Sequence, residues 1–383
     1  MAFKVDGAAA IFFESDGRSV LVAKGIRHEA GAPIGSGAPV ALNAQTATSF
    51  NSLNAFLTEG YVENYFAVAK NQGETSGYAA GGSHPSQSPS TINVIDKWPF
   101  SSDANATDVG DLTVTKYSAA GVSSPAHGYT VGGSEPIRSN VIDRFAYASD
   151  GNATDHGDLA AAVVENVGSQ DKDHGYTFGG RTPAPIGPST PLDTVEKFPF
   201  ANANGGVDQG DLSIGSYHAC SQTSPTHAYI SSGQTTFSTS SITSSIRKAP
   251  FASLTSMSVI GNITVQRRDA SGSQSATHGY THGGRPIPPP PAYSPNAIVA
   301  INVIDKFPYA SDADATDVGD LYPNPRNGHK NTAGQSSTTH GYMSAGEYAY
   351  NNEIHKYSFT VDGNSTDVGD MTVARGYMSG HQF

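Results

Sequence analysis

The sequence is poor in charge and in cysteine, and it has no long apolar run. Charged residues make up 15% of its 383 residues and hydrophobic residues 37%. No stretch of about 18 apolar residues occurs, so we expect no membrane-spanning helix. The start, Met1–Gly7, lacks the basic and apolar segments of a secretory signal. The single cysteine, Cys220, excludes an internal disulfide framework.

Positive charge is also scarce. Lys and Arg total 22 against 34 Asp and Glu, giving a net charge of −12. An acidic surface repels phosphate backbones, so nucleic acid is not expected as a partner. Glycine (42) and proline (23) are abundant instead. This composition suits short strands joined by turns and argues against long helices.

A block of the form His-Gly-Tyr, ending four residues later in Gly-Gly, recurs along the chain, as in His127–Gly133. Its tyrosine is present six times, at Tyr78, Tyr129, Tyr176, Tyr229, Tyr280 and Tyr342. A second block, Asn93–Phe100 in its first copy, carries Lys or Arg and an aromatic residue three positions later in each copy. The period is about 50 residues, the length expected for one blade of a β-propeller.

Each period contains four short segments with strand character and no helical pattern. The block Val94–Trp98 alternates apolar and polar residues with the period of a strand. Four strands and a diglycine in such a period indicate a propeller blade. We therefore predict an all-β fold, a six-bladed β-propeller over residues 61–383, with seven blades if the head of the chain adds strands.

Two segments compete to close the ring. Thr372–Phe383 aligns with the small-residue strand of the other repeats, and we predict that it completes the first blade. Tyr65–Asn71 also matches that strand, so one of the two is surplus. The fourth repeat departs from the others, with Ser232 in the diglycine, Ala249 in place of the aromatic residue and no acidic loop.

Residues 1–60 do not fit the repeat. The apolar runs Ala9–Glu14 and Ser19–Ala23 flank an Asp-Gly turn, which predicts a pair of strands. Because a propeller needs no such head to close, we predict a small β-rich arm for anchoring or assembly. A flap packed on the propeller is the alternative.

The repeats carry an acidic loop of the form Asp-x-Asn-x-x-Asp-x-Gly-Asp. Oxygen ligands at alternate positions suit Ca²⁺, which takes 6–8 oxygens in flexible geometry. The alternative is turn chemistry, in which these side chains bond their own backbone. The loop is degraded in the third repeat, which favours turn chemistry. The candidate calcium ligands are Asp103, Asn105, Asp108, Asp111, Asp150, Asn152, Asp155, Asp158, Asp312, Asp314, Asp317, Asp320, Asp362, Asn364, Asp367 and Asp370.

The sequence contains no nucleophile elbow, phosphate loop or zinc spacing, and we expect no catalytic residue and no enzymatic activity. We expect each histidine of the repeats to hydrogen-bond the turn before its strand. A ring of imidazoles in the central channel is the alternative.

Binding is expected in the loops after the diglycine, which vary most. The longest, Arg285–Ile301, holds a stiff polyproline segment that would lose little entropy on binding, or would act as a rigid spacer. The candidate binding residues are Arg285, Pro288, Pro290 and Tyr293.

A strand ending in Gly-Gly, followed by a strand with an aromatic residue, resembles kelch repeats. The usual kelch tryptophan has no clear counterpart, and Gly-Asp-Leu occupies roughly its place. The motifs Asn-Val-Ile-Asp-Lys-Phe, Ala-Thr-Asp-Val-Gly-Asp-Leu and His-Gly-Tyr-Thr resemble propeller repeats in virion structural and fibre-type proteins of tailed phages with marine and cyanobacterial hosts.

The resemblance implies a non-enzymatic virion structural protein of tail-fibre, receptor-binding or decoration type, made in the host cytoplasm without a signal peptide. Residues 1–60 would join other virion proteins in a homo-oligomeric or larger assembly. The propeller would bind a host-surface glycan or protein. The alternatives are a cellular kelch-type adaptor for protein partners and a glycan-binding lectin.

Overall fold

The structure, a computed structural model, describes strands Ala9–Phe13 and Ser19–Ala23 and residues 71–383 except 85, 87–89, 136, 183–190, 239–240, 255–256, 287–299, 322–328 and 347–350. The chain divides into two compact units, Met1–Ala67 and Val68–Phe383. In the first unit, β1 (Ala9–Phe13) pairs antiparallel with β2 (Ser19–Ala23), the strand pair that the Asp-Gly turn predicts. In the part of the chain that is described, no helix is long and apolar enough to cross a membrane.

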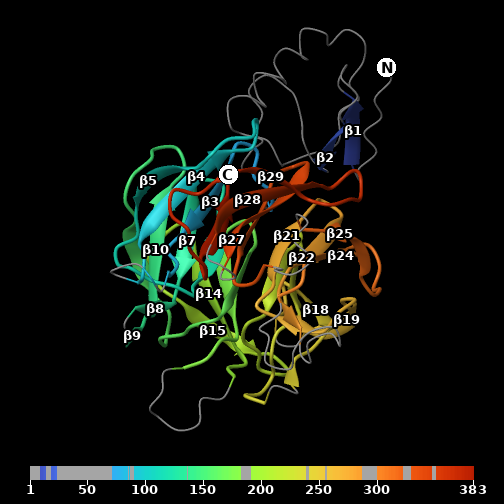
Figure 1. Cartoon of the computed structure of the whole chain (residues 1–383). Coiled ribbons are helices and arrows are strands. Elements are labelled where there is room, and N and C mark those ends of the chain that lie inside the picture. Colours follow the sequence, from blue (N-terminus) through green and yellow to red (C-terminus); the bar gives the residue numbers. More distant parts are fainter. Residues whose placement is uncertain are drawn as a thin grey trace, which may run out of the picture. The chain divides into compact units, whose positions relative to one another are not determined.

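The second unit is a β-propeller of six four-stranded antiparallel sheets, the blades (Figure 1). From the axis outward, blade 1 is β30 (Ser379–Gln382), β3 (Ser76–Ala80), β4 (Val94–Pro99) and β5 (Thr107–Asp111); blade 2 is β6 (Ala120–Ser123), β7 (His127–Val131), β10 (Val141–Ala146) and β11 (Thr154–Asp158); blade 3 is β12 (Val167–Gln170), β13 (His174–Phe178), β14 (Thr194–Pro199) and β15 (Val207–Asp211).

Blade 4 is β16 (Cys220–Thr223), β17 (His227–Ser231), β18 (Ser245–Pro250) and β19 (Ser258–Asn262); blade 5 is β21 (Ser271–Gln274), β22 (His278–His282), β24 (Val303–Pro308) and β25 (Thr316–Asp320); blade 6 is β26 (Ala333–Ser336), β27 (His340–Gly346), β28 (Asn351–Ser358) and β29 (Thr366–Asp370). There are also two short antiparallel strand pairs. One joins β8 (Ser134–Glu135) and β9 (Ile137–Arg138), and the other joins β20 (Arg267–Arg268) and β23 (Arg285–Pro286). The predicted all-β, six-bladed fold is confirmed, and the seven-blade alternative is wrong.

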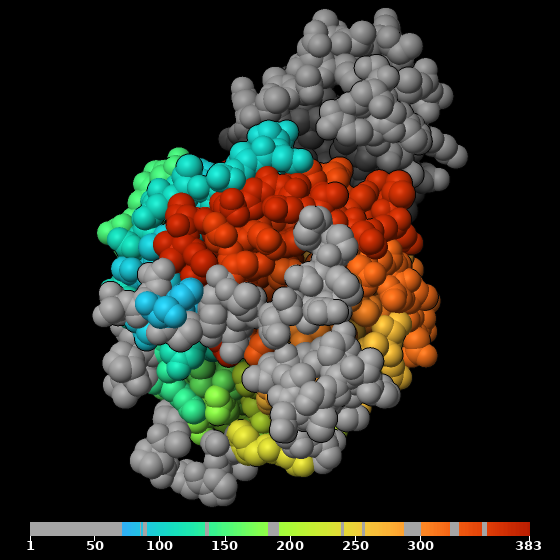
Figure 2. All heavy atoms as spheres, viewed as in Figure 1, coloured from blue at the N-terminus to red at the C-terminus, as the bar shows by residue number. Residues whose placement is uncertain are grey.

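The last strand closes the ring. β30 pairs with β3, so the C-terminal segment completes the first blade, as predicted. In Figure 2 the red C-terminal residues lie directly against the cyan residues near the start of the propeller. The competing segment lies mostly outside the described residues. A chain closed in this way leaves no free inner edge on its first blade.

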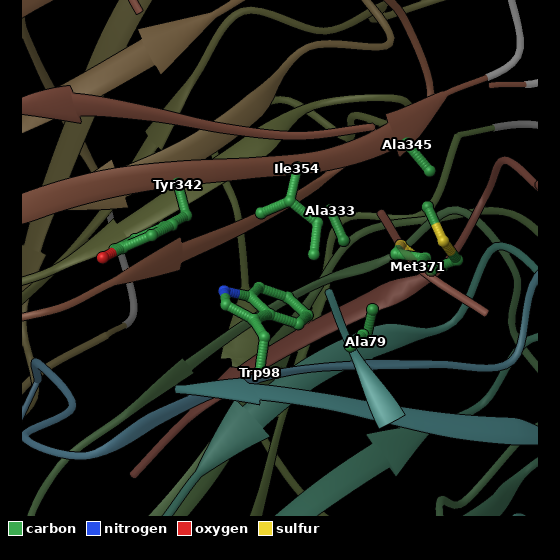
Figure 3. Close-up of a cluster of buried hydrophobic side chains, with 9 residues drawn as sticks. Ala79, Trp98, Ala333, Tyr342, Ala345, Ile354 and Met371 are labelled. Carbon is green, nitrogen blue, oxygen red and sulfur yellow. The ribbon is translucent and has the colours of Figure 1, made fainter. Parts of the chain in front are cut away.

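Blades 6 and 1 meet over an apolar cluster (Figure 3). Trp98 of β4 is buried there, facing Tyr342 and Ile354 of blade 6, with Ala79 and Met371 beside them. The seam between the first and last blades is therefore a continuous hydrophobic core, which stabilises the closed ring.

In five of the six blades, the aromatic residue of the third strand lies over a glycine of the second strand. A Cβ atom on any of these glycines would collide with the ring; the pairs are Gly77 with Trp98, Gly128 with Phe145, Gly175 with Phe198, Gly279 with Phe307, and Gly341 with Tyr357. In blade 4 both members differ, and Ala228 is opposite Ala249. The departure of the fourth repeat is therefore coupled, because a ring fits here only when its partner lacks a Cβ atom.

The innermost strands pack backbone to backbone around the axis. Their second position is glycine in five blades (Gly121, Gly168, Gly272, Gly334 and Gly380). A Cβ atom on these glycines would meet the carbonyl group of the equivalent residue in the preceding blade. Blade 4 has Ser221, whose hydroxyl donates to the Gly168 carbonyl oxygen at 2.6 Å. The small-residue pattern of this strand is thus a requirement of ring packing.

Candidate binding pocket at the propeller axis

Two kinds of connection leave the blades at the same end. These are the loops between second and third strands and the segments that join one blade to the next, as the strand pairings require. We call this end the mouth. The acidic loops join third and fourth strands and leave from the opposite end. The variable loops and the blade connectors therefore meet around one opening of the axis.

Six equivalent residues form a ring at the mouth. Each lies two positions before an innermost strand and has a left-handed backbone, with φ between 52° and 62°: Ser118, Glu165, His218, Asp269, Asn331 and Tyr377. Amide groups donate to the carbonyl oxygen of the preceding ring residue, for example from Ser118 to Tyr377 at 2.8 Å and from Asn331 to Asp269 at 2.9 Å. Non-glycine residues in this conformation cost about 1 kcal/mol or more each, and these hydrogen bonds offset that cost.

The ring surrounds a pocket of about 380 Å³. Its lining comes from all the blade connectors and three of the variable loops: Tyr117, Ser118, Ser134, Arg138, Val164, Glu165, Arg181, His218, Arg268, Asp269, Arg285, Lys330 and Tyr377. Deeper along the axis, a narrower space of about 160 Å³ is lined by small and uncharged residues of the innermost strands. Of these two spaces along the axis, only the one at the mouth has charged side chains in its lining.

His218 bridges the two acids of the pocket. Its Nε2 atom is 3.2 Å from Glu165 Oε2, and its Nδ1 atom is 2.8 Å from Asp269 Oδ1. Burial lowers the pKa of His218, but the two carboxylates outweigh that effect and leave its pKa raised. Burial raises the pKa of Asp269, but His218 and then Arg268 outweigh burial and leave that pKa lowered. The pocket therefore favours the charged forms of both groups, imidazolium and carboxylate.

Glu165 is also bound by Arg181, which donates to both of its carboxylate oxygens. The Arg181 guanidinium lies over the ring of Tyr217, 5.8 Å from its centroid. Arg138 donates to the backbone oxygen of Arg181 at 3.2 Å. Burial, and then the charge of Arg181, lower the pKa of Arg138. This side of the pocket therefore has two cations, Arg138 and Arg181, and one acid, Glu165, so it carries a net positive charge.

The charge count of the whole lining is positive. Arg138, Arg181, Arg268, Arg285 and Lys330 supply five cations against the two carboxylates of Glu165 and Asp269, a difference of +3 without His218. The chain as a whole has a net charge of −12. The mouth is thus a cationic pocket on an acidic protein, which attracts anions.

The structure places one predicted binding residue, Arg285, in this pocket, on β23. Pro288, Pro290 and Tyr293 lie outside the described residues. Ser134, Arg138, Arg181 and Arg285 of the variable loops line the pocket. That these loops bind a ligand stays a prediction.

The acidic loops hold neighbouring blades together. Their first acids pair with a lysine of the preceding blade: Lys97 with Asp150, Lys248 with Asp312, Lys306 with Asp362, and Lys356 with Asp103. The second group, Asn105, Asn152, Asp314 and Asn364, accepts a backbone amide at the end of the preceding blade's outermost strand.

The third group, Asp108, Asp155, Asp317 and Asp367, accepts the amide of the glycine two residues later. The last group, Asp111, Asp158, Asp320 and Asp370, ends the outermost strands. The contacts of the third group are those of turn chemistry, whereas the contacts of the first two groups join neighbouring blades. Calcium binding by these loops stays a prediction.

The repeat histidines begin the second strands and do not line the axis, so the ring of imidazoles is wrong. Their backbone amides donate to the preceding turn, for example from His127 to Ser124 Oγ at 3.0 Å and from His174 to Asp171 at 2.7 Å. Cys220 is buried in β16, 3.1 Å from Ser231 Oγ.

Most of the pocket was not predicted from the sequence. Glu165, His218 and Asp269 belong to a set of six equivalent positions with six different residues, three positions before the glycine of the innermost strand, or before Ser221 in blade 4. That contrast was readable by aligning the repeats. The joint position of the residues around one mouth required the closed ring.

Comparison with known proteins supports the fold. No protein-family model matches the chain, and no curated protein matches it in sequence. Among solved structures, one titled "Structure of YjhT" is similar with a TM-score of 0.57 at 12% identity, over 71% of this chain and 89% of that chain. This chain is a β-propeller, and the likeness shows the fold alone. The kelch and phage resemblances stay predictions.

Proposed function

We propose that the protein is a non-enzymatic binding protein that holds an anionic group of a surface glycan in its axial pocket. The observation that carries this proposal is the lining of five cations and two acids at the mouth of an acidic propeller. Anionic groups of this kind are carboxylates, sulfates and phosphates.

Arginine suits such ligands because its planar guanidinium donates two parallel hydrogen bonds to one anion. Tyr117 and Tyr377 lie edge to face in the pocket, 6.0 Å apart, and supply apolar surface beside the cations. A volume of about 380 Å³ is within the range of small-ligand pockets. A sugar with one acidic substituent matches both the charge and the size.

The contacts of His218 favour binding over catalysis. A general base needs an accessible nitrogen or oxygen within reach of the substrate proton. Both ring nitrogens of His218 face carboxylates, and Glu165 is engaged by Arg181 as well. These groups orient one another and leave Arg138 and Arg285, which have no ion pair among the described residues, to meet the ligand. The likeness in fold to a solved propeller does not bear on activity.

The setting we propose is a virion. The repeat motifs support it, as does the head, residues 1–60, which the closed propeller does not require. In this setting the head joins other virion proteins and the mouth binds the host surface. A cellular adaptor for protein partners and a free lectin are the competing settings.

A glycan array tests the binding proposal. The full chain should bind carboxylated, sulfated or phosphorylated glycans and leave neutral ones unbound. Arg138→Gln combined with Arg285→Gln should abolish the signal, whereas Lys172→Gln, at an exposed turn, should leave it unchanged. Signals confined to neutral glycans, or an unaffected double variant, would contradict the proposal.

Cross-linking mass spectrometry of purified particles tests the virion setting. The chain should be present, with cross-links from residues 1–60 to other virion proteins. A chain found only in soluble host fractions would contradict this setting and leave the binding proposal standing.

A further inference from the structure

Each blade places a polar side chain of its third strand against the connector that leads into the blade. In blades 1, 2 and 5 this side chain is an acid in a fully buried ion pair with a cation of the connector, and both side chains are 0% exposed. The distances are 3.1 Å for Arg375 with Asp96, 2.6 Å for Lys116 with Asp143 and 2.8 Å for Arg267 with Asp305. A cation of the protein thus lies in this space.

Blade 4 keeps the cation but reverses its origin. Arg247 of β18 occupies the position of the acid, and it donates to the backbone oxygen of Ile214 and to Ser216 Oγ on the connector. Blade 3 keeps only the acid, Glu196, which accepts the amide of Ala160 at 2.9 Å. Four of six blades therefore supply a positive charge to this space from their own side chains.

In blade 6 both members are histidines. His355 takes the position of the acid and His329 the position of the cation, and their ring centroids are 4.8 Å apart. Glu353, on the same strand as His355, places its Oε2 atom 3.0 Å from His355 Nε2. One ligand atom from each of the three lies within 4.8 Å of the others, which among the described residues holds for no other group of three such side chains.

Blade 6 has no lysine or arginine in either position of the pair, unlike blades 1, 2, 4 and 5. His282 of blade 5 is fully buried, and its Nε2 atom has no hydrogen-bond partner among the described residues. Two imidazoles and a carboxylate thus surround a space that holds a cation in the other blades.

We propose that His329, Glu353 and His355 bind a transition-metal dication of the zinc class. Two histidines and one carboxylate form a recurrent zinc ligand set, with a fourth position left for water or another donor. Tetrahedral bonds of about 2.0–2.1 Å separate ligand atoms by about 3.3 Å. The His355 and Glu353 atoms, 3.0 Å apart, are already near this spacing, and the widest pair, within 4.8 Å, must close by up to about 1.5 Å. The metal takes the place of the buried ammonium or guanidinium group and joins blade 6 to its connector.

The experiment uses the full chain, stripped with a chelator and dialysed, then titrated with ZnCl₂ by calorimetry and with CoCl₂ by visible absorption. We expect one zinc ion per chain, a tetrahedral cobalt spectrum and a raised Tm on zinc addition. His329→Gln should weaken zinc affinity at least about tenfold. His127→Gln, which removes the histidine at the start of β7, should leave the zinc affinity unchanged.

A second variant separates loss of metal from loss of folding. His329→Arg with His355→Asp installs the ion pair of the other blades, and it should fold, bind no zinc and show a zinc-independent Tm. The proposal is overturned if the stripped wild-type chain binds no zinc and its Tm is unchanged. Equal zinc binding by the Arg/Asp variant would overturn it as well.

Discussion

The residues at the mouth vary between repeats, whereas the equivalent residues of the innermost strands are nearly constant. The two sets of positions are only three positions apart in sequence, as Ser118 and Gly121 are. At the inner strands the equivalent positions are glycine in five of six blades, as at Gly121. At the mouth the equivalents of Ser118 are six different residues that share one backbone conformation. A residue type that recurs in the blades indicates a position where backbone packing allows little else. Different residue types at positions with the same backbone conformation indicate side chains that packing does not fix and that can serve in binding.

The largest effect is expected from breaking the repeated region. Gly334→Ala places a methyl group against the Gly272 carbonyl oxygen, and overpacking of this kind costs about 3 kcal/mol of unfolding free energy. Chemical denaturation measures the loss. Gly363→Ala, where a Cβ atom would meet nothing within 4 Å, is the matched control. Equal destabilisation of the two variants would show that the close approach is not what selects glycine.

The coupled exception in blade 4 gives the next effect. Ala249→Phe should destabilise the chain by about 2 kcal/mol, because the new ring meets the Ala228 methyl group. Adding Ala228→Gly should recover most of that loss, as in the other five blades. A double-mutant cycle measures the coupling. Additive effects of the two substitutions would refute the pairing of ring and glycine.

At the mouth, His218 should make stability depend on pH. Its folded pKa is raised, so its contribution is fully present below the unfolded value of about 6.5 and is lost as pH rises through the folded value. The stability difference between wild type and His218→Gln should therefore shrink as pH rises from about 6.5 through the raised folded pKa. Burial lowers the pKa of His227, so its protonation in acid destabilises the fold. The stability difference between wild type and the matched variant His227→Gln should therefore grow as pH rises. Parallel pH profiles for the two variants would contradict the ion pairs of His218.

The smallest effect is expected at the acidic loops. Asp362→Asn removes the acid 2.8 Å from Lys306, a pair whose acid is 50% exposed, so the loss should stay below about 1 kcal/mol after solvent screening. Thermal denaturation with and without added Ca²⁺ decides between the two interpretations of these loops. A calcium-independent Tm agrees with turn chemistry, and a Tm that rises with Ca²⁺ in wild type but not in the variant supports calcium binding.

The repeat predicted the architecture because all six blades carry the same tyrosine and small-residue strand, and four of them carry the diglycine. The blade count and the closing strand followed from that period. The pocket did not, since Glu165, His218 and Asp269 are about 50 residues apart in sequence and meet only when the ring closes. The coupling of Ala228 to Ala249 was likewise hidden, because it depends on strand register.

The central claim is that the divergent mouth binds an anion while the repeated body holds it in place. Isothermal titration at physiological salt with an oligosaccharide ending in glucuronic acid, and with its glucose-ended twin, tests this claim most directly. We predict at least a tenfold preference of the wild-type chain for the acid, equal to about 1.4 kcal/mol, and its loss in the variant with Arg138→Gln and Arg285→Gln at unchanged Tm. Equal affinities for the two sugars in wild type, or a preference that survives in the variant, would contradict it.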